Sequence, residues 1–160
     1  MKKVIYHGPD FNGHPLYRPF PEHVDKATDG FDLATLQRIE LLIPHALAQA
    51  GGRVLAVGMT LAYPAEIDTS TIDNRVITDF TSHFCRYLRE QRGLSVDFLQ
   101  VRERAPRTGR LHHHCIFLIG GGWWQFTDYR TVRAIWRMIL ERWFGWAGTA
   151  AEVPVQIVDN

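Results

Sequence analysis

Residues 53–63 read RVLAVGMTLAY, and this stretch decides the fold. Bulky apolar residues alternate with small ones along it; the bulky set is Leu55, Val57, Met59 and Leu61, and the small set is Ala56, Gly58 and Thr60. Side chains on a β-strand point alternately to opposite faces. The stretch therefore predicts a strand with one bulky face and one thin face.

Five further elements follow this strand. They are a helix that opens at Asp73 or Asn74 and closes at Gly93, a strand over Leu94–Arg104, a strand over Leu111–Ile119, a helix capped by Thr127 that ends before Gly145, and a strand over Val153–Val158. The order βαββαβ predicts an α+β, ferredoxin-like core. Its four-stranded antiparallel sheet carries both helices on one face, has its first and third strands at the centre, and leaves the other face open.

Residues 1–31 show no hydrophobic period and hold four prolines and three glycines, which indicates an irregular arm. Asp32 is typical of an N-cap, and the helix after it is ended or kinked by Pro44. We therefore expect one compact protein with an N-terminal arm and helix over residues 1–52 and the ferredoxin-like domain over 53–160.

The composition is that of an ordinary globular domain, with 160 residues, 46% of them hydrophobic and 22% charged. The start of the chain lacks the apolar core of a secretory signal, and no apolar run is long enough to span a membrane. The two cysteines, Cys85 and Cys115, form no CxxC pair, so we expect reduced thiols in the core of a cytoplasmic protein.

Charge is unevenly distributed although the net charge is only +1. Residues 86–142 carry eleven arginines, five acidic residues and no lysine. Guanidinium groups match phosphate oxygens and stack on bases, so this segment is consistent with nucleic-acid binding. A solvated surface encoded by an arginine-rich genome explains the same composition, and charge alone does not separate the two.

Three consecutive histidines, His112, His113 and His114, lie on the predicted third strand. Strand geometry puts His112 and His114 on one face and His113 on the other. Two imidazoles at this spacing can share one divalent cation, and the apolar run after them makes the strand a rigid platform. A short histidine run can also be incidental.

Glu103 on the preceding strand offers the oxygen ligand that such a pair needs. If the hairpin closes with Pro106 opposite Leu111, Glu103 lies opposite His114 on the same face. A bulge at Gly109 would instead place Arg102 there. We expect the first register, because the second directs guanidinium groups at the ligands. Two imidazoles and a carboxylate suit Mg²⁺, Mn²⁺, Zn²⁺ or Fe²⁺.

With this strand order, the histidine pair running into aliphatic residues resembles the HUH endonuclease superfamily. The run from Val101 through the Gly109 turn to Ile119 is similar to replication-initiation proteins of filamentous phages. The resemblance covers about residues 53–158 and implies a nuclease that nicks and joins single-stranded DNA at a replication origin in rolling-circle replication. It implies Mg²⁺ or Mn²⁺ on His112, His114 and Glu103, and a tyrosine that forms a 5′-phosphotyrosine bond.

The nucleophile departs from the family pattern, where the tyrosine lies on a helix after the fourth strand. No tyrosine follows Tyr129 in this chain. We therefore expect the nucleophile beyond Asn160, with Tyr129 as the fallback, or a homologue that binds DNA and metal without cleavage.

The predicted DNA-binding side chains surround the hairpin and follow the third strand: Arg102, Arg104, Arg107, Arg110 and Trp123. The alternative function is a catalytically inert nucleic-acid-binding module with an RRM-like fold, in which an open sheet binds strands through arginines and aromatic side chains. The donor set also fits a non-haem iron oxygenase, although such triads usually belong to β-barrels. Nucleotide- and serine-hydrolase motifs do not occur.

Overall fold

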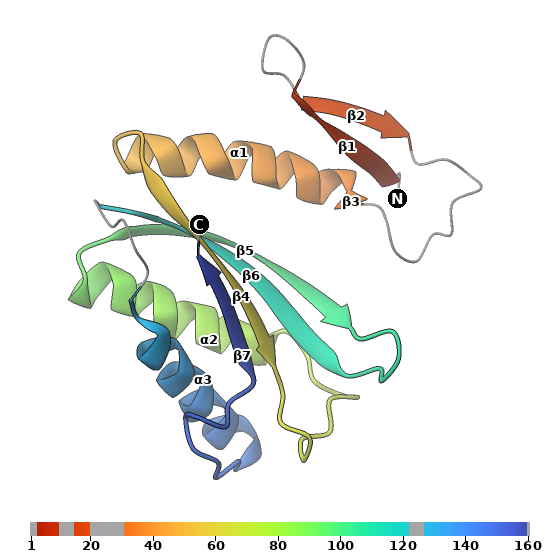
Figure 1. The fold of residues 1–160 in the computed structure, drawn as a ribbon, viewed down its shortest axis with the longest axis vertical. Coiled ribbons are helices and arrows are strands. Elements are labelled where there is room, and N and C mark those ends of the chain that lie inside the picture. Colours follow the sequence, from red (N-terminus) through yellow and green to blue (C-terminus); the bar gives the residue numbers. More distant parts are fainter. Residues whose placement is uncertain (1–2, 10–14, 20–30, 122–126, 160) are drawn as a thin grey trace. The chain divides into compact units, whose positions relative to one another are not determined.

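A computed structural model describes residues 3–9, 15–19, 31–121 and 127–159 of the chain (Figure 1). The chain divides into two compact units, Met1–Pro44 and His45–Asn160. The first unit holds strands β1 (Lys3–Pro9), β2 (Pro15–Pro19) and β3 (Phe31–Asp32), which form an antiparallel sheet in the order β2-β1-β3. The irregular arm expected for this part is therefore wrong.

Prolines explain why the sequence concealed these strands. Pro9, Pro15 and Pro19 all stand at strand ends, where a missing N–H removes little from the ladder. Helix α1 (Leu33–Gln49) begins directly after Asp32, as expected, and continues through Pro44.

The second unit contains the four-stranded antiparallel sheet. Its strands are β4 (Val54–Ala62), β5 (Ser95–Arg104), β6 (Leu111–Gly120) and β7 (Val155–Asp159). Their order is β5-β6-β4-β7, so the first and third strands of the βαββαβ unit are central, as predicted. Burial alternates along β4, with the bulky residues of the predicted strand inside. The α+β, ferredoxin-like fold class is confirmed.

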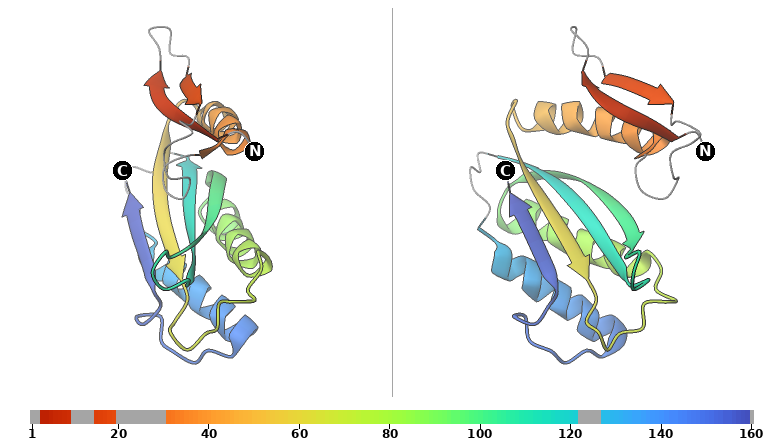
Figure 2. Two further views of the ribbon diagram at one scale, coloured as in Figure 1. Left: turned by 90° about the vertical axis from the view of Figure 1, so that its right-hand side faces the viewer. Right: turned by 45° about the vertical axis from the view of Figure 1, so that its right-hand side comes forward.

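Helices α2 (Arg75–Arg86) and α3 (Tyr129–Phe144) lie on the same side of this sheet (Figure 2). A π-helical turn, η1 (Tyr87–Gln91), extends α2 before Gly93. The Asp73 carboxylate accepts a hydrogen bond from the Arg75 backbone N–H at 2.8 Å and so serves the first turn of α2. Thr127 is not the cap of α3, whose N-cap position is Asp128.

The core fills the space between the sheet and the two helices. Trp136 on α3 is fully buried, and its indole N–H donates to the Ala62 carbonyl at 2.9 Å. The thiols of Cys85 and Cys115 are buried, as expected, and burial raises their pKa to about 11 and about 12. Raised pKa values make both thiols poor nucleophiles.

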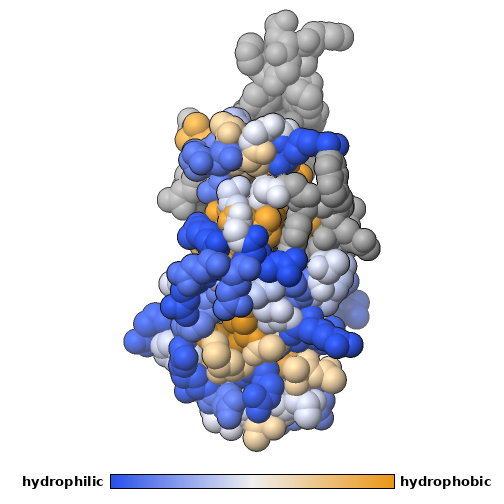
Figure 3. Space-filling model, turned by 90° about the vertical axis from the view of Figure 1, so that its left-hand side faces the viewer, coloured by the Kyte–Doolittle hydropathy of each residue, from blue (hydrophilic) through white to orange (hydrophobic). Residues whose placement is uncertain are grey.

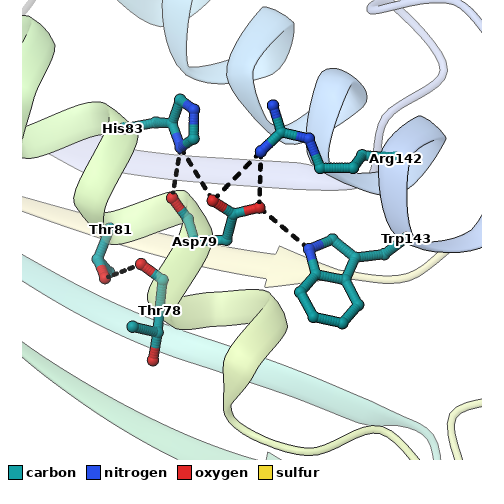
Figure 4. A network of polar contacts seen from close by, with 6 residues as sticks. All are labelled: Thr78, Asp79, Thr81, His83, Arg142 and Trp143. Atoms are coloured by element: carbon teal, nitrogen blue, oxygen red, sulfur yellow. Dashed lines mark hydrogen bonds and ion pairs between the residues drawn. The ribbon is translucent and has the colours of Figure 1, made fainter.

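The Asp79 carboxylate on α2 contacts side chains of both α2 and α3 (Figure 4). Its carboxylate accepts hydrogen bonds from Arg142 at 3.1 Å and from the Trp143 indole N–H at 3.0 Å, and His83 Nδ1 lies 3.1 Å from it. One carboxylate therefore joins donors from both helices.

The opposite face of the sheet is covered only in part by described residues. Ala46 and Leu118 are buried here, and His45 Nδ1 lies 3.2 Å from the Asp97 carboxylate. A Cβ atom on Gly120 would lie 2.3 Å from the Ala50 Cβ, so the end of α1 needs glycine at this point. Beyond it, the described residues of the second unit leave this face uncovered, and we call it the open face.

The described surface carries mainly hydrophilic residues on the side seen in Figure 3, with hydrophobic residues in smaller groups between them. No helix in the described part of the chain is both long enough and apolar enough to cross a membrane.

Candidate metal centre

The three histidines alternate between the two faces of β6. His112 and His114 are part-exposed on the open face, whereas His113 is fully buried on the helix-covered face. The apolar residues that follow them place β6 at the centre of the sheet, between β5 and β4. The strand therefore holds the two outward imidazoles on a rigid support.

Glu103 joins the two outward histidines. Its Oε2 atom lies 3.2 Å from His112 Nε2 and 2.8 Å from His114 Nε2, and the two imidazole rings are nearly perpendicular, at 86°. The three ligand atoms lie within 4.8 Å of one another, and all three side chains are accessible. The structure thus brings together the three residues that the sequence selected as ligands.

The predicted register of the hairpin is wrong by two residues. Glu103 pairs with His112, and Val101 takes the expected place opposite His114. The reason is the loop between the strands, which spans Ala105–Arg110 and is closed by hydrogen bonds from Ala105 N to Arg110 O and from Gly109 N to Ala105 O. A shift of two residues keeps every side chain on its face, so Glu103 still reaches both histidines.

Arg102 pairs with His113 rather than with His114, so the alternative register does not occur. Gly109 does adopt a left-handed conformation, with φ at 64°, but it does so inside the loop. Its conformation closes the turn without adding a residue to either strand.

The donor set fits a small divalent cation. Imidazole nitrogens and carboxylate oxygens are ligands that such ions use, and the three ligand atoms lie within 4.8 Å of one another. The side chains of Glu103, His112 and His114 are all accessible to solvent. Further ligands can therefore reach a cation bound by these three residues.

Thr60 supports one of the two histidines. Its hydroxyl lies on β4 directly opposite His114, and its Oγ1 is 3.1 Å from His114 Nδ1. When Nδ1–H donates to this oxygen, the lone pair of His114 remains on Nε2, which faces Glu103. His112 lies opposite Ala62, whose methyl group offers no acceptor.

His113 lies beneath the cluster and has a structural role. The Tyr63 hydroxyl is 3.1 Å from His113 Nε2, and both side chains are buried. Burial, reinforced by the positive charge of Arg102, lowers the pKa of His113 to about 4, and burial raises the pKa of Tyr63. Both groups stay neutral at pH 7, and the tautomer of His113 decides which of the two donates this hydrogen bond. Among described residues, His113 Nδ1 has no partner.

Three of the four hairpin arginines hold a loop of their own chain. Arg104 donates to the carbonyls of Thr69, Ser70 and Gly109, at 3.0–3.2 Å, and Arg110 donates to those of Tyr63 and Ala65. Arg102 donates to the carbonyl of Ile72. These side chains therefore fasten residues 63–72 to the hairpin.

Two predicted DNA-binding residues remain, Arg107 and Trp123. Arg107 is exposed in the hairpin loop and has no hydrogen-bond or ion-pair partner among the described residues. Trp123 lies outside the described residues.

The same use of arginine extends through the arginine-rich segment. Six of its eleven arginines donate to backbone carbonyls, namely Arg89, Arg102, Arg104, Arg110, Arg133 and Arg137. On the open face, the described residues of the four strands include no lysine, arginine, phenylalanine, tyrosine or tryptophan. The described strand residues of the open face therefore carry none of the arginine charge of residues 86–142.

The tyrosines with described side chains do not reach the cluster. Tyr63 is buried under the sheet, and Tyr87 stacks on Phe84 in the helix layer. Tyr129 opens α3, which follows the far end of β6 and covers the other face of the sheet. The structure thus separates Tyr129, the fallback nucleophile, from His112 and His114.

Sequence reasoning missed Thr60 as part of the site. The signal was present, because Thr60 is the polar member of the small-residue face of the stretch 53–63. Recognising it required the pairing of β4 with β6, which brings Thr60 opposite His114.

Comparison with known proteins adds no identification to this geometry. No protein-family model, no curated protein and no solved structure matches the chain. The three convergent ligands on the open face of a ferredoxin-like sheet are therefore the observation on which a function is inferred.

Proposed function

We propose that the domain binds Mg²⁺ or Mn²⁺ at Glu103, His112 and His114 and uses it to nick and join single-stranded DNA, as HUH endonucleases do. The observation that carries this proposal is the convergence of three ligand atoms within 4.8 Å on the open face. The HUH resemblance supplies the reaction class, and the ferredoxin-like fold is consistent with it.

Each residue has a distinct part in such a site. The imidazoles of His112 and His114 would offer nitrogen ligands, and the Glu103 carboxylate would offer an oxygen ligand. With a cation on His114 Nε2, the Nδ1–H of the same ring would donate to Thr60 Oγ1, which would hold the ring in place. When bound, the cation would polarise a phosphoryl oxygen and offset the charge that develops there.

The open face favours this function over the inert RRM-like module. RRM-type sheets bind bases through aromatic side chains and strands through basic ones. Apart from the imidazoles of His112 and His114, the described strand residues of the open face include neither, and its ionisable side chains include Asp97 and Glu103. A bound divalent cation would supply the positive charge that a phosphate needs here.

The covalent step needs a tyrosine that this part of the chain does not bring to the site. Tyr63, Tyr87 and Tyr129 all lie away from the open face. We therefore expect the 160-residue chain to bind an origin-type oligonucleotide without forming a 5′-phosphotyrosine adduct.

Calorimetric titration with Mn²⁺ tests the metal site. The wild type should bind one ion, His114→Ala should lose it, and Glu103→Gln should bind it more weakly. The matched control is His45→Ala, because this exposed histidine also lies beside a carboxylate, at 3.2 Å from Asp97. Equal Mn²⁺ binding by the wild type and His114→Ala would overturn the site.

Fluorescence anisotropy with a labelled oligonucleotide tests the function. Mn²⁺ should raise the affinity of the wild type for single-stranded DNA and should leave His114→Ala unchanged. The same gain for duplex DNA, or no gain at all, would overturn the proposal.

A further inference from the structure

A pocket lies where the loop after β4 meets the loop before β7, and none of the three metal ligands lines it. Its volume is about 430 Å³, within the range of about 300–1,000 Å³ that small-ligand pockets occupy. Its walls combine aromatic rings and prolines with two carboxylates: Tyr63, Pro64, Trp146, Pro154, Glu66 and Glu152. Among the described residues, no lysine, arginine or histidine lines this pocket.

Two arginines outside the lining hold the backbone of the pocket in place. Arg110 donates to the carbonyls of Tyr63 and Ala65 at 3.0 and 3.2 Å. Arg137 Nε donates to the carbonyl of Gly148 at 2.8 Å. Because these bonds fasten both loops, the pocket is formed before a ligand arrives, and binding has to order few groups.

The Trp146 indole has a restricted position. It packs partly buried against the core, and a Cβ atom on Gly148 would lie 2.0 Å from its Cζ2 atom. Glycine at position 148 therefore lets the backbone pass directly against the ring. The ring is held by its neighbours while part of it remains accessible in the pocket.

The two carboxylates of the pocket are available to a ligand. Glu66 is exposed and has no hydrogen-bond or ion-pair partner among the described residues. Glu152 Oε2 accepts hydrogen bonds from the N–H and the hydroxyl of Thr149 at 2.7 and 2.8 Å, which leaves Oε1 for another donor. The hydrogen bond from the Thr149 backbone lowers the pKa of Glu152, so this carboxylate is ionised at neutral pH.

An aromatic wall beside two carboxylates selects a flat cation. A guanidinium group is planar, stacks on aromatic rings and can donate two parallel hydrogen bonds to one carboxylate. A lysine ammonium is a compact and strongly hydrated charge, so it gains less from an indole face. Phosphate groups of a nucleic acid would be repelled by the two carboxylates.

We propose that this pocket binds the side chain of an arginine on a protein partner, with the guanidinium stacked on Trp146 and hydrogen-bonded to Glu66 or Glu152. An arginine within a peptide fits better than free arginine, because the carboxylate of the free amino acid would be repelled by the two glutamates. The inference goes beyond the proposed function, since it involves neither the cation nor DNA.

NMR titration with the peptide acetyl-Ala-Arg-Ala-amide tests the pocket. The indole N–H signal of Trp146, assigned with Trp146→Phe, should shift and saturate. Because Trp146 also packs against the core, the exposed glutamates are the better targets for substitution. Glu66→Gln and Glu152→Gln should each raise the dissociation constant about fivefold, the upper value for exposed ion pairs. The matched control is Glu90→Gln, which removes the same charge from an exposed residue outside the pocket.

Two further peptides test the chemistry of recognition. Citrulline has the flat shape of arginine without its charge, and its peptide should bind about tenfold more weakly than the arginine peptide. The lysine peptide keeps the charge without the flat group, and it should also bind more weakly than the arginine peptide.

Each opposite result would refute the inference. Absence of a saturable shift, or equal binding of the arginine and citrulline peptides, would overturn the site. Equal binding of the lysine peptide would refute recognition of a guanidinium group, and tighter binding of free L-arginine would refute the protein partner. An equal loss in Glu90→Gln would attribute the effect to net charge. His114→Ala should bind the arginine peptide as the wild type does, so failure of the metal site would leave this test unaffected.

Discussion

Thr60→Val should weaken Mn²⁺ binding by about tenfold. Threonine and valine have nearly the same shape, so the substitution removes the hydroxyl that lies 3.1 Å from His114 Nδ1 and leaves packing unchanged. Without this acceptor, the imidazole can rotate and can carry its proton on Nε2, the nitrogen that faces Glu103. The cation must then select one tautomer and one orientation from several.

The size of the effect follows from the asymmetry of the site. Loss of a partner outside the ligand shell costs about 10- to 100-fold in metal affinity. Only His114 has such a partner on β4, since His112 lies opposite Ala62. The ligation by His112 and Glu103 should therefore persist, and the loss should fall at the lower limit, about 1.4 kcal/mol.

Isothermal titration calorimetry with Mn²⁺ measures this affinity, and ¹⁵N NMR of the imidazoles reports the tautomer. Thr60→Ser keeps the hydroxyl and should restore both the affinity and the wild-type tautomer of His114. Thr60→Val within twofold of the wild type would refute the positioning role of Thr60. A loss shared equally by Thr60→Ser would attribute the effect to packing.

Three predictions concern stability, each measured as the free energy of unfolding in urea. Tyr63→Phe should cost about 1–3 kcal/mol, because it leaves the buried ring of His113 without its hydroxyl partner; a neutral result would mean that water replaces the hydroxyl. Asp79→Asn should cost about 1–2 kcal/mol, because the charged acceptor shared by α2 and α3 is lost. An unchanged urea unfolding midpoint would show that this contact does not stabilise the fold. Gly120→Ala should cost about 1–3 kcal/mol through the clash with Ala50, and it would contradict the close packing at this point if it were stabilising.

The fold of the second unit could be predicted because its signals are local. The alternation in residues 53–63 reports one buried face directly, and Gly93 and Gly145 mark element ends by their left-handed conformation. The strands of the first unit could not be predicted, because the prolines at their ends are equally typical of loops.

The ligand set was also predictable, but its surroundings were not. Alternation fixes the faces of His112, His114 and Glu103 whatever the exact register, so an error of two residues did no harm. The roles of the arginines depend on contacts distant in sequence: Arg104 donates to Thr69, thirty-five residues earlier. A composition that favours phosphate binding is equally able to hold backbone carbonyls.

The arginine contacts to residues 63–72 have a consequence for how this unit opens. Arg102 and Arg104 on β5, together with Arg110 beside β6, hold carbonyls on both arms of that segment. A loop of this kind would ordinarily exchange its amide protons through independent local fluctuations. Here its release requires the hairpin that carries Glu103 and His112 to give up several hydrogen bonds at the same moment. The loop and the hairpin should therefore behave as one cooperative unit in native-state hydrogen exchange, and a bound cation should slow exchange in both.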